Sequence, residues 1–595
     1  MPRPAKPTAT SVLALQSALP ASAEPIAGLA GEAGSKAVLE NLNIALAELK
    51  ALAIAPMLQR AIDAIRAEDP KTAYEWAVKA LERDEHSGLG WYLLAITLEQ
   101  GGDFANSIRA YEAALKLLPD HADVACDLGR LALRLGMKPQ AEELFRRFLG
   151  HYPDDLEAIN NLVCAIREQG RYDEAIETLR AAIIRMPEVS MLWNTMGTIV
   201  SDQGDAANAQ VFYEEALRLQ PNFPKARHNL SNVMLMRGEA DAALVEIDAA
   251  LADVKSESDH QMMRLARATT LMCAGRIGEG WDEYESRLHP QLSIRTAFAI
   301  DRTRWEPGAN LAGKSLLVVA EQGLGDEVLF ANVLPDVIDR LGPEGKLRLA
   351  VESRLVPIFQ RSFPMAKVQA HATFQVGSVI NRVVPFIDDG PKIDLWTPMA
   401  SLLREFRRSE EVFPKRPNFL TADPKRVAHW RKILRAAPAR PKIGLLWKSL
   451  VSRDARHRLF SPFAQWEPIL TQPGVCLVNL QYGDCSEEIA FAKRELGVDI
   501  WTPPGIDLKQ DLDDVAALSC ALDLVVGFSN ATSNIAAACG VPSFLISAPG
   551  AWPRLGTSRY PWYPRTSVFQ PSSYGDWDSV MAEVAQAIGV WAKDR

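Results

Sequence analysis

Three carboxylates stand close together on one short turn of the sequence. Glu321, Asp326 and Glu327 belong to EQGLGDE, which follows the apolar run SLLVVA at 315–320 and precedes VLFANVLPDVIDRL, which has helical character. A carboxylate at the edge of a strand-to-helix turn is partly removed from water, and this makes it more basic. The turn therefore offers candidates for proton transfer, with Asp326 foremost and the two glutamates as rivals. The alternative role for Asp326 is to cap the following helix.

Two other segments have the composition of an anion-binding site. The loop after KIGLLW (442–447) concentrates positive charge in a chain whose formal net charge is −9, although a solvated basic loop has the same composition. Its members are Lys448, Arg453, Arg456, His457 and Arg458. The turn after DLVVGF (523–528) brings hydroxyls and amides to the start of a helix, where backbone N–H groups attract phosphate. Its members are Ser529, Asn530, Thr532, Ser533 and Asn534.

The elements that must position these side chains alternate between strand and helix. Apolar runs without helical periodicity predict strands at 315–320, 346–351, 383–388, 442–447, 475–481, 523–528 and 542–547. Such alternation predicts parallel sheets. The polar, proline-containing stretch near 414–441 separates two sets, so we expect two lobes with a ligand cleft between them. The turn Gly323-Leu-Gly325 has no third glycine, so it is half of a Rossmann-like unit and not a dinucleotide fingerprint.

The order of these segments resembles the tetratricopeptide-fused relatives of the bacterial heptosyltransferase-like glycosyltransferases. EQGLGD follows a W-x-x-G-x-x-L-x-G-K lead-in, and the second half contains Leu480-Gln481, DLDDVAALSCALDLVV (511–526), Cys539-Gly-Val-Pro542 and PWYPRTSVFQ with a later GDW. The resemblance covers about 275–595. It implies a GT-B fold and an inverting, metal-independent transfer of a sugar from a nucleotide-activated donor, with no cofactor.

The same resemblance implies roles for individual residues. Asp326 would be the base, and Gly325 and Gln481 would join the two anion-binding segments around the donor. The family usually has Asp-Thr where this chain has Ser529 and Asn530, and His where it has Asn534. Loss of the acid suits a donor that carries its own carboxylate. Among such enzymes the chain resembles the flagellin glycosyltransferases, which implies a CMP-activated nonulosonic acid such as pseudaminic acid as donor and Ser/Thr of flagellin as acceptor.

The first half of the chain is an internal repeat of 34 residues. Pro119, Pro153, Pro187 and Pro221 fall at this spacing, each just after a helical segment, where a proline ends a helix. Three sets of residues, called columns below, recur at the same position of each 34-residue repeat. They are Leu94, Leu128, Leu162, Met196 and Leu230; the small Ser107, Ala141, Ala175, Ala209 and Ala243; and the large Tyr111, Phe145, Leu179, Tyr213 and Ile247. The pattern is similar to the tetratricopeptide repeat, which predicts a helical solenoid with a protein partner.

The first helix of each repeat carries amides in register. They are Asn160, Asn161, Asn194, Asn229 and Asn232, with His228 beside them. Amides both donate to and accept from an extended backbone, so this polar ladder is a candidate for gripping a polypeptide. The alternative is that asparagine is simply common near helix starts.

The overall composition limits the classes of protein and the cellular locations that fit this chain. The net charge of −9 argues against broad binding of nucleic acid, and seven scattered cysteines favour a reducing cytoplasm without disulfides or a metal site. No run is apolar enough for membrane insertion. The segment SVLALQSALPASA superficially resembles a signal peptide, but Gln16, Ser17 and Pro20 interrupt it. We expect Trp447, Trp552, Trp562 and Tyr563 to pack internally more readily than to stack on a ligand.

We therefore expect four segments. They are a disordered leader (1–35), the repeat array (36–290), an acceptor-side lobe (291–425) and a nucleotide-sugar lobe (426–595). Two alternatives to flagellin glycosylation stay open. One is a glycosyltransferase for another acceptor, such as a cell-surface polysaccharide or another protein. The other is a scaffold or chaperone with an inactive transferase domain.

Overall fold

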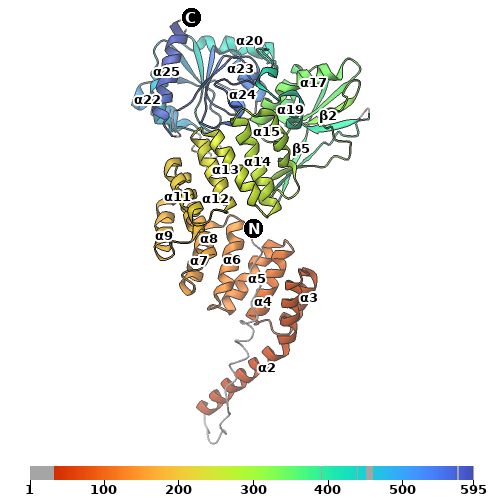
Figure 1. Cartoon of the computed structure of the whole chain (residues 1–595), viewed down its shortest axis with the longest axis vertical. Coiled ribbons are helices and arrows are strands. Elements are labelled where there is room, and N and C mark those ends of the chain that lie inside the picture. Colours follow the sequence, from red (N-terminus) through yellow and green to blue (C-terminus); the bar gives the residue numbers. More distant parts are fainter. Residues whose placement is uncertain (1–31, 390–391, 439, 450–459, 572–574, 594–595) are drawn as a thin grey trace. The chain divides into compact units, whose positions relative to one another are not determined.

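The protein forms two compact units, Met1–Pro187 and Glu188–Arg595. The structure, a computed structural model, describes residues 32–389, 392–438, 440–449, 460–571 and 575–593. Residues 1–31 of the expected leader lie outside these ranges, and residues 32–35 begin the first described helix. The division at 187 falls inside the repeat array, so the last repeats belong to the same unit as the α/β lobes (Figure 1).

The array consists of helical hairpins. The first unit contains α2 (Glu32–Arg66), α3 (Pro70–Arg83), α4 (Gly88–Gln100), α5 (Phe104–Leu117), α6 (Ala122–Arg134), α7 (Lys138–His151), α8 (Leu156–Arg167) and α9 (Tyr172–Arg185). The second unit begins with α10 (Ser190–Asp202), α11 (Ala206–Leu219), α12 (Pro224–Met236), α13 (Ala240–Asp253), α14 (Glu257–Cys273) and α15 (Ile277–Tyr284).

The sequence columns explain these hairpins. All three columns are buried, and the small members have no exposed surface, so the paired helices approach closely around the large members. Each of the four spaced prolines lies two residues beyond the end of a helix. Glycines in the connections adopt positive φ, including Gly170 (77°) and Gly238 (79°), which residues with a Cβ rarely adopt. The predicted repeat array is confirmed.

The first lobe is built on a parallel sheet of order β4-β3-β2-β7. Its strands are β2 (Ser315–Val319), β3 (Lys346–Val351), β4 (Ala366–Ala370) and β7 (Leu395–Pro398), and its helices are α16 (Leu324–Phe330), α17 (Leu334–Leu341), α18 (Val356–Ser362) and α19 (Leu403–Phe406). A smaller sheet of order β1-β6-β5 contains β1 (Arg295–Phe298), β5 (Ala372–Val376) and β6 (Val379–Val383). The predicted strand at 383–388 is wrong. Here β6 ends at Val383 and a turn follows, because Pro385 has no N–H for a ladder.

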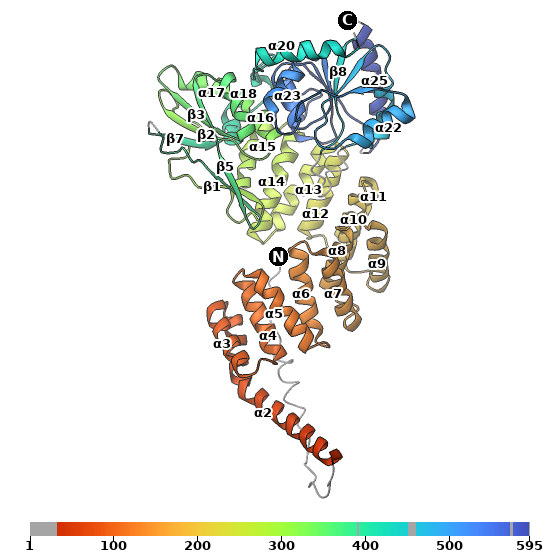
Figure 2. The ribbon, with the colours of Figure 1, turned by 180° about the vertical axis from the view of Figure 1, so that it is seen from behind.

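The second lobe has a six-stranded parallel sheet of order β10-β9-β8-β11-β12-β13. Its strands are β8 (Lys442–Leu446), β9 (Cys476–Asn479), β10 (Ile500–Trp501), β11 (Leu524–Phe528), β12 (Ser543–Ile546) and β13 (Thr566–Phe569). Its helices are α20 (Pro424–Ile433), α21 (Glu467–Leu470), α22 (Ser486–Leu496), α23 (Leu512–Ser519), α24 (Ala531–Ala538) and α25 (Trp577–Lys593), several of which lie around the sheet in Figure 2. The other six predicted strands are present, within two residues at either end.

In each sheet, the direction in which strands are added reverses beside the strand that comes first in the chain. In the first, the chain runs outward from β2 through β3 to β4 and returns to β7 on the other side of β2. In the second, it runs from β8 through β9 to β10 and returns to β11 beside β8. At such a switch point the connections leave in opposite directions, and a crevice opens at the carboxyl ends of the strands. Each lobe therefore has one such position.

A cluster of aromatic rings joins the last hairpin of the array to both lobes. Trp281 of α15 is buried edge-on against Phe330 of the first lobe and against Trp552 and Trp562 of the second, with ring centroids 5.8–6.4 Å apart. Its indole Nε1 donates to the carbonyl of Arg407 at 3.0 Å. Edge-to-face rings add to the burial of apolar surface. The array end and the lobes consequently share one hydrophobic core.

A second contact in this unit joins backbone to backbone. Gly550 has a φ of 67°, and a Cβ added to it would lie 2.0 Å from the carbonyl oxygen of Leu235 in α12. The thiol of Cys273 at the end of α14 donates to the carbonyl of Gly550 at 3.1 Å. Only glycine allows so close an approach.

The variant Gly550→Ala tests this contact. We expect its free energy of unfolding to fall by about 2 kcal/mol more than that of Gly308→Ala, because the new methyl group collides with a backbone that cannot rotate away. Gly308 is the matched control, since its φ is 85° and an added Cβ meets nothing within 4 Å. Denaturant unfolding measures both variants. Equal losses would show that the α12 contact contributes nothing.

Candidate active site

The two switch points bring the acidic turn and the polar turn together. Helix α16 follows β2 and helix α24 follows β11, and their first turns pack against each other. A Cβ added to Gly325 would lie 3.2 Å from Nδ2 of Asn534 and 3.5 Å from the backbone nitrogen of Ala531. Two segments about 200 residues apart in the sequence thus meet at the starts of two helices. This junction is the candidate active site.

Glu321 is excluded from direct contact with a ligand. It has no exposed surface, and its two oxygens accept from Nε and Nη2 of Arg287, both at 2.8 Å. It also accepts the N–H of Ala400, which follows β7. Arg287 further donates to Glu285 at 2.6 Å. A buried carboxylate held by a bidentate arginine and a backbone N–H organises the structure and leaves no oxygen facing a substrate.

The same network sets the ionisation of Glu285. Burial alone would raise the pKa of this carboxyl, but the charge and hydrogen bonds of Arg287, with help from Arg304 and Ser401, outweigh burial and lower the pKa to about 2. Burial works to lower the pKa of Arg287, and Glu321 and Glu285 together raise it above its ordinary value. Glu285 and Arg287 are therefore both ionised at neutral pH.

Glu327 is likewise engaged inside the first lobe. It is buried, and its Oε1 accepts from Nη1 of Arg382 at 2.9 Å and lies 3.2 Å from Nε2 of His371. Its Oε2 accepts the N–H of Glu352 at 2.9 Å. His371 and Arg382 come from the segment around the smaller sheet. Glu327 therefore holds this segment against α16, and sequence reasoning could not have distinguished it from Asp326.

Asp326 is the member of the three that is partly exposed. It lies in the first turn of α16, and its Oδ2 accepts the N–H of Gly323 at 3.1 Å, so it caps this helix. Its charge adds to the raised pKa of the buried phenols of Tyr560 and Tyr563, and also to that of Tyr284. A carboxylate in this position can accept a proton from a group bound between the two helices.

The polar turn is ordered by its own side chains. Asn530 accepts the N–H of Ser533 at 3.0 Å, and the Ser533 hydroxyl accepts the N–H of Asn530 at 2.8 Å, so the two form a capping box for α24. Thr532, Ser533 and Asn534 are buried, and Ser529 is exposed. Within this turn, Asn534 is the side chain that faces α16.

Lys448 lies in the turn after β8, the strand beside β11, and Gln481 follows β9. Gln481 is buried, and its Oε1 accepts the N–H groups of Trp447 at 3.0 Å and Lys448 at 2.9 Å. Gln481 thus positions the turn after β8 and has no oxygen left for a donor. The Lys448 ammonium pairs with Glu488. Arg453, Arg456, His457 and Arg458 lie outside the described residues.

An acidic segment holds the two lobes together. Asp513 of α23 pairs with Arg361 of the first lobe, and its neighbour Asp514 pairs with Arg426 of α20 at 2.9 Å. Asp511 caps α23 by accepting the N–H of Asp514 at 3.2 Å. Sequence reasoning identified this helix but not the ionic contact.

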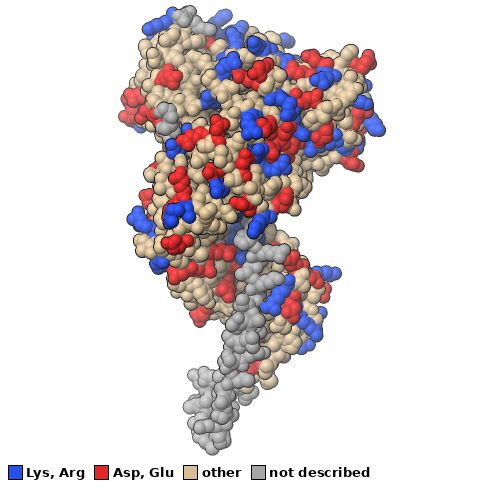
Figure 3. All heavy atoms as spheres, in the orientation of Figure 1, with Lys and Arg blue, Asp and Glu red and all other residues tan. Residues whose placement is uncertain are grey.

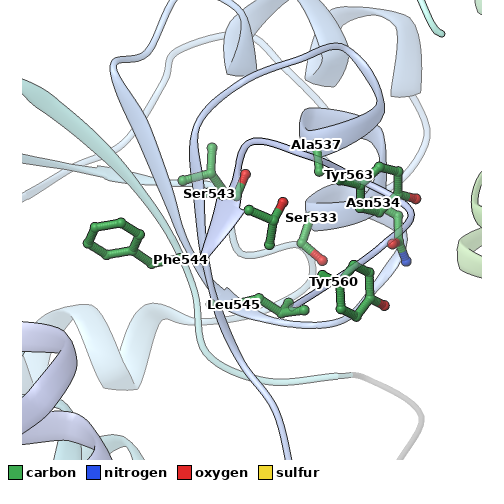
Figure 4. A pocket seen from close by; sticks show the side chains of 11 residues that line it. Ser533, Asn534, Ala537, Ser543, Phe544, Leu545, Tyr560 and Tyr563 are labelled. Atoms are coloured by element: carbon green, nitrogen blue, oxygen red, sulfur yellow. The ribbon is translucent and has the colours of Figure 1, made fainter. Parts of the chain in front are cut away.

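Below the junction lies a small cavity that sequence reasoning missed. Its walls come from β11, β12, α24 and the segment RYPWYPR, and Ser533, Asn534, Tyr560 and Tyr563 line it (Figure 4). Tyr563 appeared in the sequence only as a packing residue, and Tyr560 had no signal beyond lying in the same proline-flanked segment. Trp447 and Trp562 are buried in the hydrophobic core, as expected, and Trp552 packs against Trp562.

The amides of the array are partly bonded to one another. Within the second unit, Nδ2 of Asn229 donates to Oδ1 of Asn194 at 3.0 Å, and Nδ2 of Asn232 lies 3.3 Å from Nε2 of His228. Burial lowers the pKa of His228. Asn160 and Asn161 lie on α8 of the first unit and are half-buried. The register predicted for the ladder is therefore present as an amide pair linking α10 and α12.

Charge and apolar surface have ordinary distributions. Acidic and basic side chains are interspersed over the face shown in Figure 3. Among the described residues, no helix combines the length and apolarity that crossing a membrane requires. The same residues contain no group of three His, Cys, Asp or Glu side chains arranged to hold a metal ion.

Comparisons with known proteins agree with the repeats. Models of the tetratricopeptide repeat match residues 88–121, 126–188 and 201–266. Protein FlbA of Caulobacter vibrioides is 52% identical over 567 residues, which are 95% of this chain and 94% of that protein. Protein O-mannosyl-transferase TMTC1 of Mus musculus is 32% identical over 98 residues, which are 16% of this chain and 10% of that protein. MamA of Desulfovibrio magneticus RS-1 is 20% identical, covers 29% of this chain and 96% of its own, and has a TM-score of 0.27.

The low pKa of Glu285 predicts a pH-dependent contribution to stability. Because the folded pKa of about 2 lies below the ordinary 4.5, this contribution is complete above pH 4.5 and disappears as the pH falls toward 2. Glu285→Gln should be roughly 2 kcal/mol less stable than the wild type at pH 6. The difference should shrink in denaturant titrations at successively lower pH.

The control for this titration is Glu279→Gln, which removes an exposed carboxylate paired with Arg276. We expect this variant to change stability little at any pH. A difference between wild type and Glu285→Gln that stays constant down to pH 2 would contradict the assigned ionisation.

Proposed function

The chain belongs to the family of Protein FlbA of Caulobacter vibrioides, and from this premise we propose that it is a glycosyltransferase that modifies a protein captured by its repeats. The observation that carries the proposal is the meeting of α16 and α24 at the switch points of two parallel sheets. It supplies a partly exposed acid, Asp326, opposite a helix start suited to an anionic leaving group. The two lobes would form a GT-B fold, with the first lobe on the acceptor side and the second on the donor side.

The chemistry is an inverting displacement. A hydroxyl oxygen of the acceptor attacks the anomeric carbon, the bond from that carbon to the phosphate oxygen of the donor breaks, and the nucleotide leaves with the electron pair. Asp326 accepts the proton of the attacking hydroxyl. The N-terminus of α24 and Lys448 stabilise the negative charge on the departing phosphate. No metal takes part in this scheme.

The donor that suits the polar turn carries its own carboxylate. Ser529, Asn530 and Asn534 supply amides and a hydroxyl but no acid, so they do not repel a second anionic group. A CMP-activated nonulosonic acid, such as pseudaminic acid, has this chemistry. The acceptor would be Ser or Thr of flagellin in the cytoplasm, bound along the first helices of the repeats.

One relative bears on the reaction class. The name of the TMTC1 relative describes a protein O-mannosyl-transferase, but the match spans only 98 residues. The match supports only one point, which is that another protein named for sugar transfer to proteins has a similar segment. The scaffold alternative is favoured by one observation, since Asp326 acts as a helix cap whether or not it transfers protons.

Asp326→Asn separates these two roles. Asparagine keeps an oxygen for the N–H of Gly323 but cannot act as a base, so the helix cap survives. We expect transfer of a nonulosonate mass from CMP-pseudaminate to flagellin to fall at least about 100-fold. The thermal midpoint should stay near that of the wild type. Mass spectrometry of flagellin measures the transfer.

Asp326→Ala removes both the cap and the base, so it should lose transfer and also some stability. If Asp326→Asn retains more than a tenth of the wild-type rate, Asp326 is not the base. If the wild type binds flagellin but transfers nothing from any nucleotide sugar, the scaffold alternative holds.

Removing the amide pair of α10 and α12 tests whether the array binds the acceptor protein. We expect Asn194→Ala combined with Asn229→Ala to weaken flagellin binding about tenfold, because two amides that bond a polypeptide backbone are removed. Fluorescence titration of labelled flagellin measures the affinity. Asn208→Ala on α11 is the control, since this amide is exposed and bonds only Asp205. Equal affinities of all three proteins would assign the capture of flagellin to another surface.

A further inference from the structure

Two tyrosines stack beneath the start of α24. The rings of Tyr560 and Tyr563 are 5.7 Å apart and inclined by 21°, and Phe419 stacks on the other face of the pair, 6.0 Å from Tyr563. Each tyrosine is only 3% exposed. The Tyr563 hydroxyl has no hydrogen-bond partner among the described residues, and the Tyr560 hydroxyl interacts there with the side chain of Ser529. Leaving a buried hydroxyl without a partner is unfavourable, so the Tyr563 hydroxyl requires a reason.

The hydroxyls lie on the polar side of the cavity. In Figure 4 they point to the same side as the Asn534 amide, away from Phe544. Asn534 in turn faces Gly325 of α16, where an added Cβ would lie 3.2 Å from Nδ2 of Asn534. The two hydroxyls, the amide of Asn534 and the first turn of α24 therefore converge beneath the α16–α24 junction.

Both phenols are neutral at physiological pH. Burial raises the pKa of Tyr560 above its ordinary value, and Asp326 adds to this shift while Ser529 only partly opposes it. Burial, with Tyr560 and Asp326, also raises the pKa of Tyr563. A neutral phenol donates its hydrogen without adding charge. The two phenols and the amide of Asn534 therefore offer neutral donors to an anionic oxygen, and the charge of Asp326 opposes its binding.

We propose that Tyr563 and Tyr560 donate hydrogen bonds to an anionic oxygen, phosphoryl or carboxylate, of the activated sugar donor. This inference rests on the proposed function and names two donor-binding residues for it. The hydroxyls are enclosed while α16 packs on α24, so the anion reaches them when the two helices separate. An internal water bonded to both hydroxyls is the competing explanation.

Tyr563→Phe and Tyr560→Phe test the proposal. The probes are inorganic pyrophosphate, CMP and N-acetylneuraminate, titrated calorimetrically into the full chain. We expect each variant to bind at least one probe about tenfold more weakly, the effect of losing one hydrogen bond to a charged group. Weaker binding of pyrophosphate and CMP assigns the hydroxyls to phosphoryl oxygens, and weaker binding of N-acetylneuraminate alone assigns them to the carboxylate.

Stability distinguishes a binding role from a structural role. Because the Tyr563 hydroxyl has no partner among the described residues, the thermal midpoint of Tyr563→Phe should equal or exceed that of the wild type. Tyr560→Phe loses only the interaction with the exposed Ser529, so its thermal midpoint should stay near that of the wild type. Tyr213→Phe is the matched control, a buried tyrosine of α11 whose hydroxyl lies 3.3 Å from Thr198. It should leave binding of every probe unchanged.

Binding constants within twofold of the wild type for every probe in both variants would overturn the proposal and leave the hydroxyls to an internal water. Failure of the wild type to bind any probe would also overturn it. Weaker pyrophosphate binding by Tyr563→Phe in a protein that transfers no sugar would retain the anion site and reject the proposed function. Unchanged binding beside wild-type transfer activity would reject only the anion site.

Discussion

The buried ion pair of Arg287 and Glu321 is the contact on which the arrangement of the second unit depends. Arg287 follows the last hairpin of the array, Glu321 lies just after β2, and Ala400 follows β7. One bidentate pair and one backbone N–H therefore join three separate segments. A buried pair is not itself a large source of stability, but Glu321 without Arg287 would be an uncompensated charge in the core. The pair thereby fixes where the turn after β2 begins and where α16 points.

As a result, the three neighbouring carboxylates of this turn lie in different environments. Glu321 and Glu327 are held by arginines in the interior, and Asp326, between them in the sequence, is left at the surface of the junction. The division results from environment alone, since the residues are chemically almost identical. The three acids of this turn thus have different structural roles, because two are buried against arginines and the third caps α16.

The sequence was sufficient for everything that depends on local periodicity. The spacing of Pro119 and its equivalents placed the hairpins, and unbroken apolar runs placed six strands, because burial on both faces removes polar residues from such segments. It failed at 383–388, where an apolar composition concealed a turn at Pro385. The contact of Gly325 with Asn534, the burial of Glu321 and the stacking of Tyr560 on Tyr563 beside Phe419 were not predictable, because each depends on how distant segments pack.

The backbone contact of Gly550 with Leu235 has a consequence for how such proteins diversify. The last hairpin shares a core with the lobes, and α12 contacts Gly550, whereas the chain divides into compact units at Pro187. Recombination that exchanged arrays at the end of the repeats would separate Trp281 and Arg287 from their partners. Exchange near residue 187 would leave these contacts intact. The helices that make these contacts, α12, α14 and α15, must therefore change in concert with the lobes.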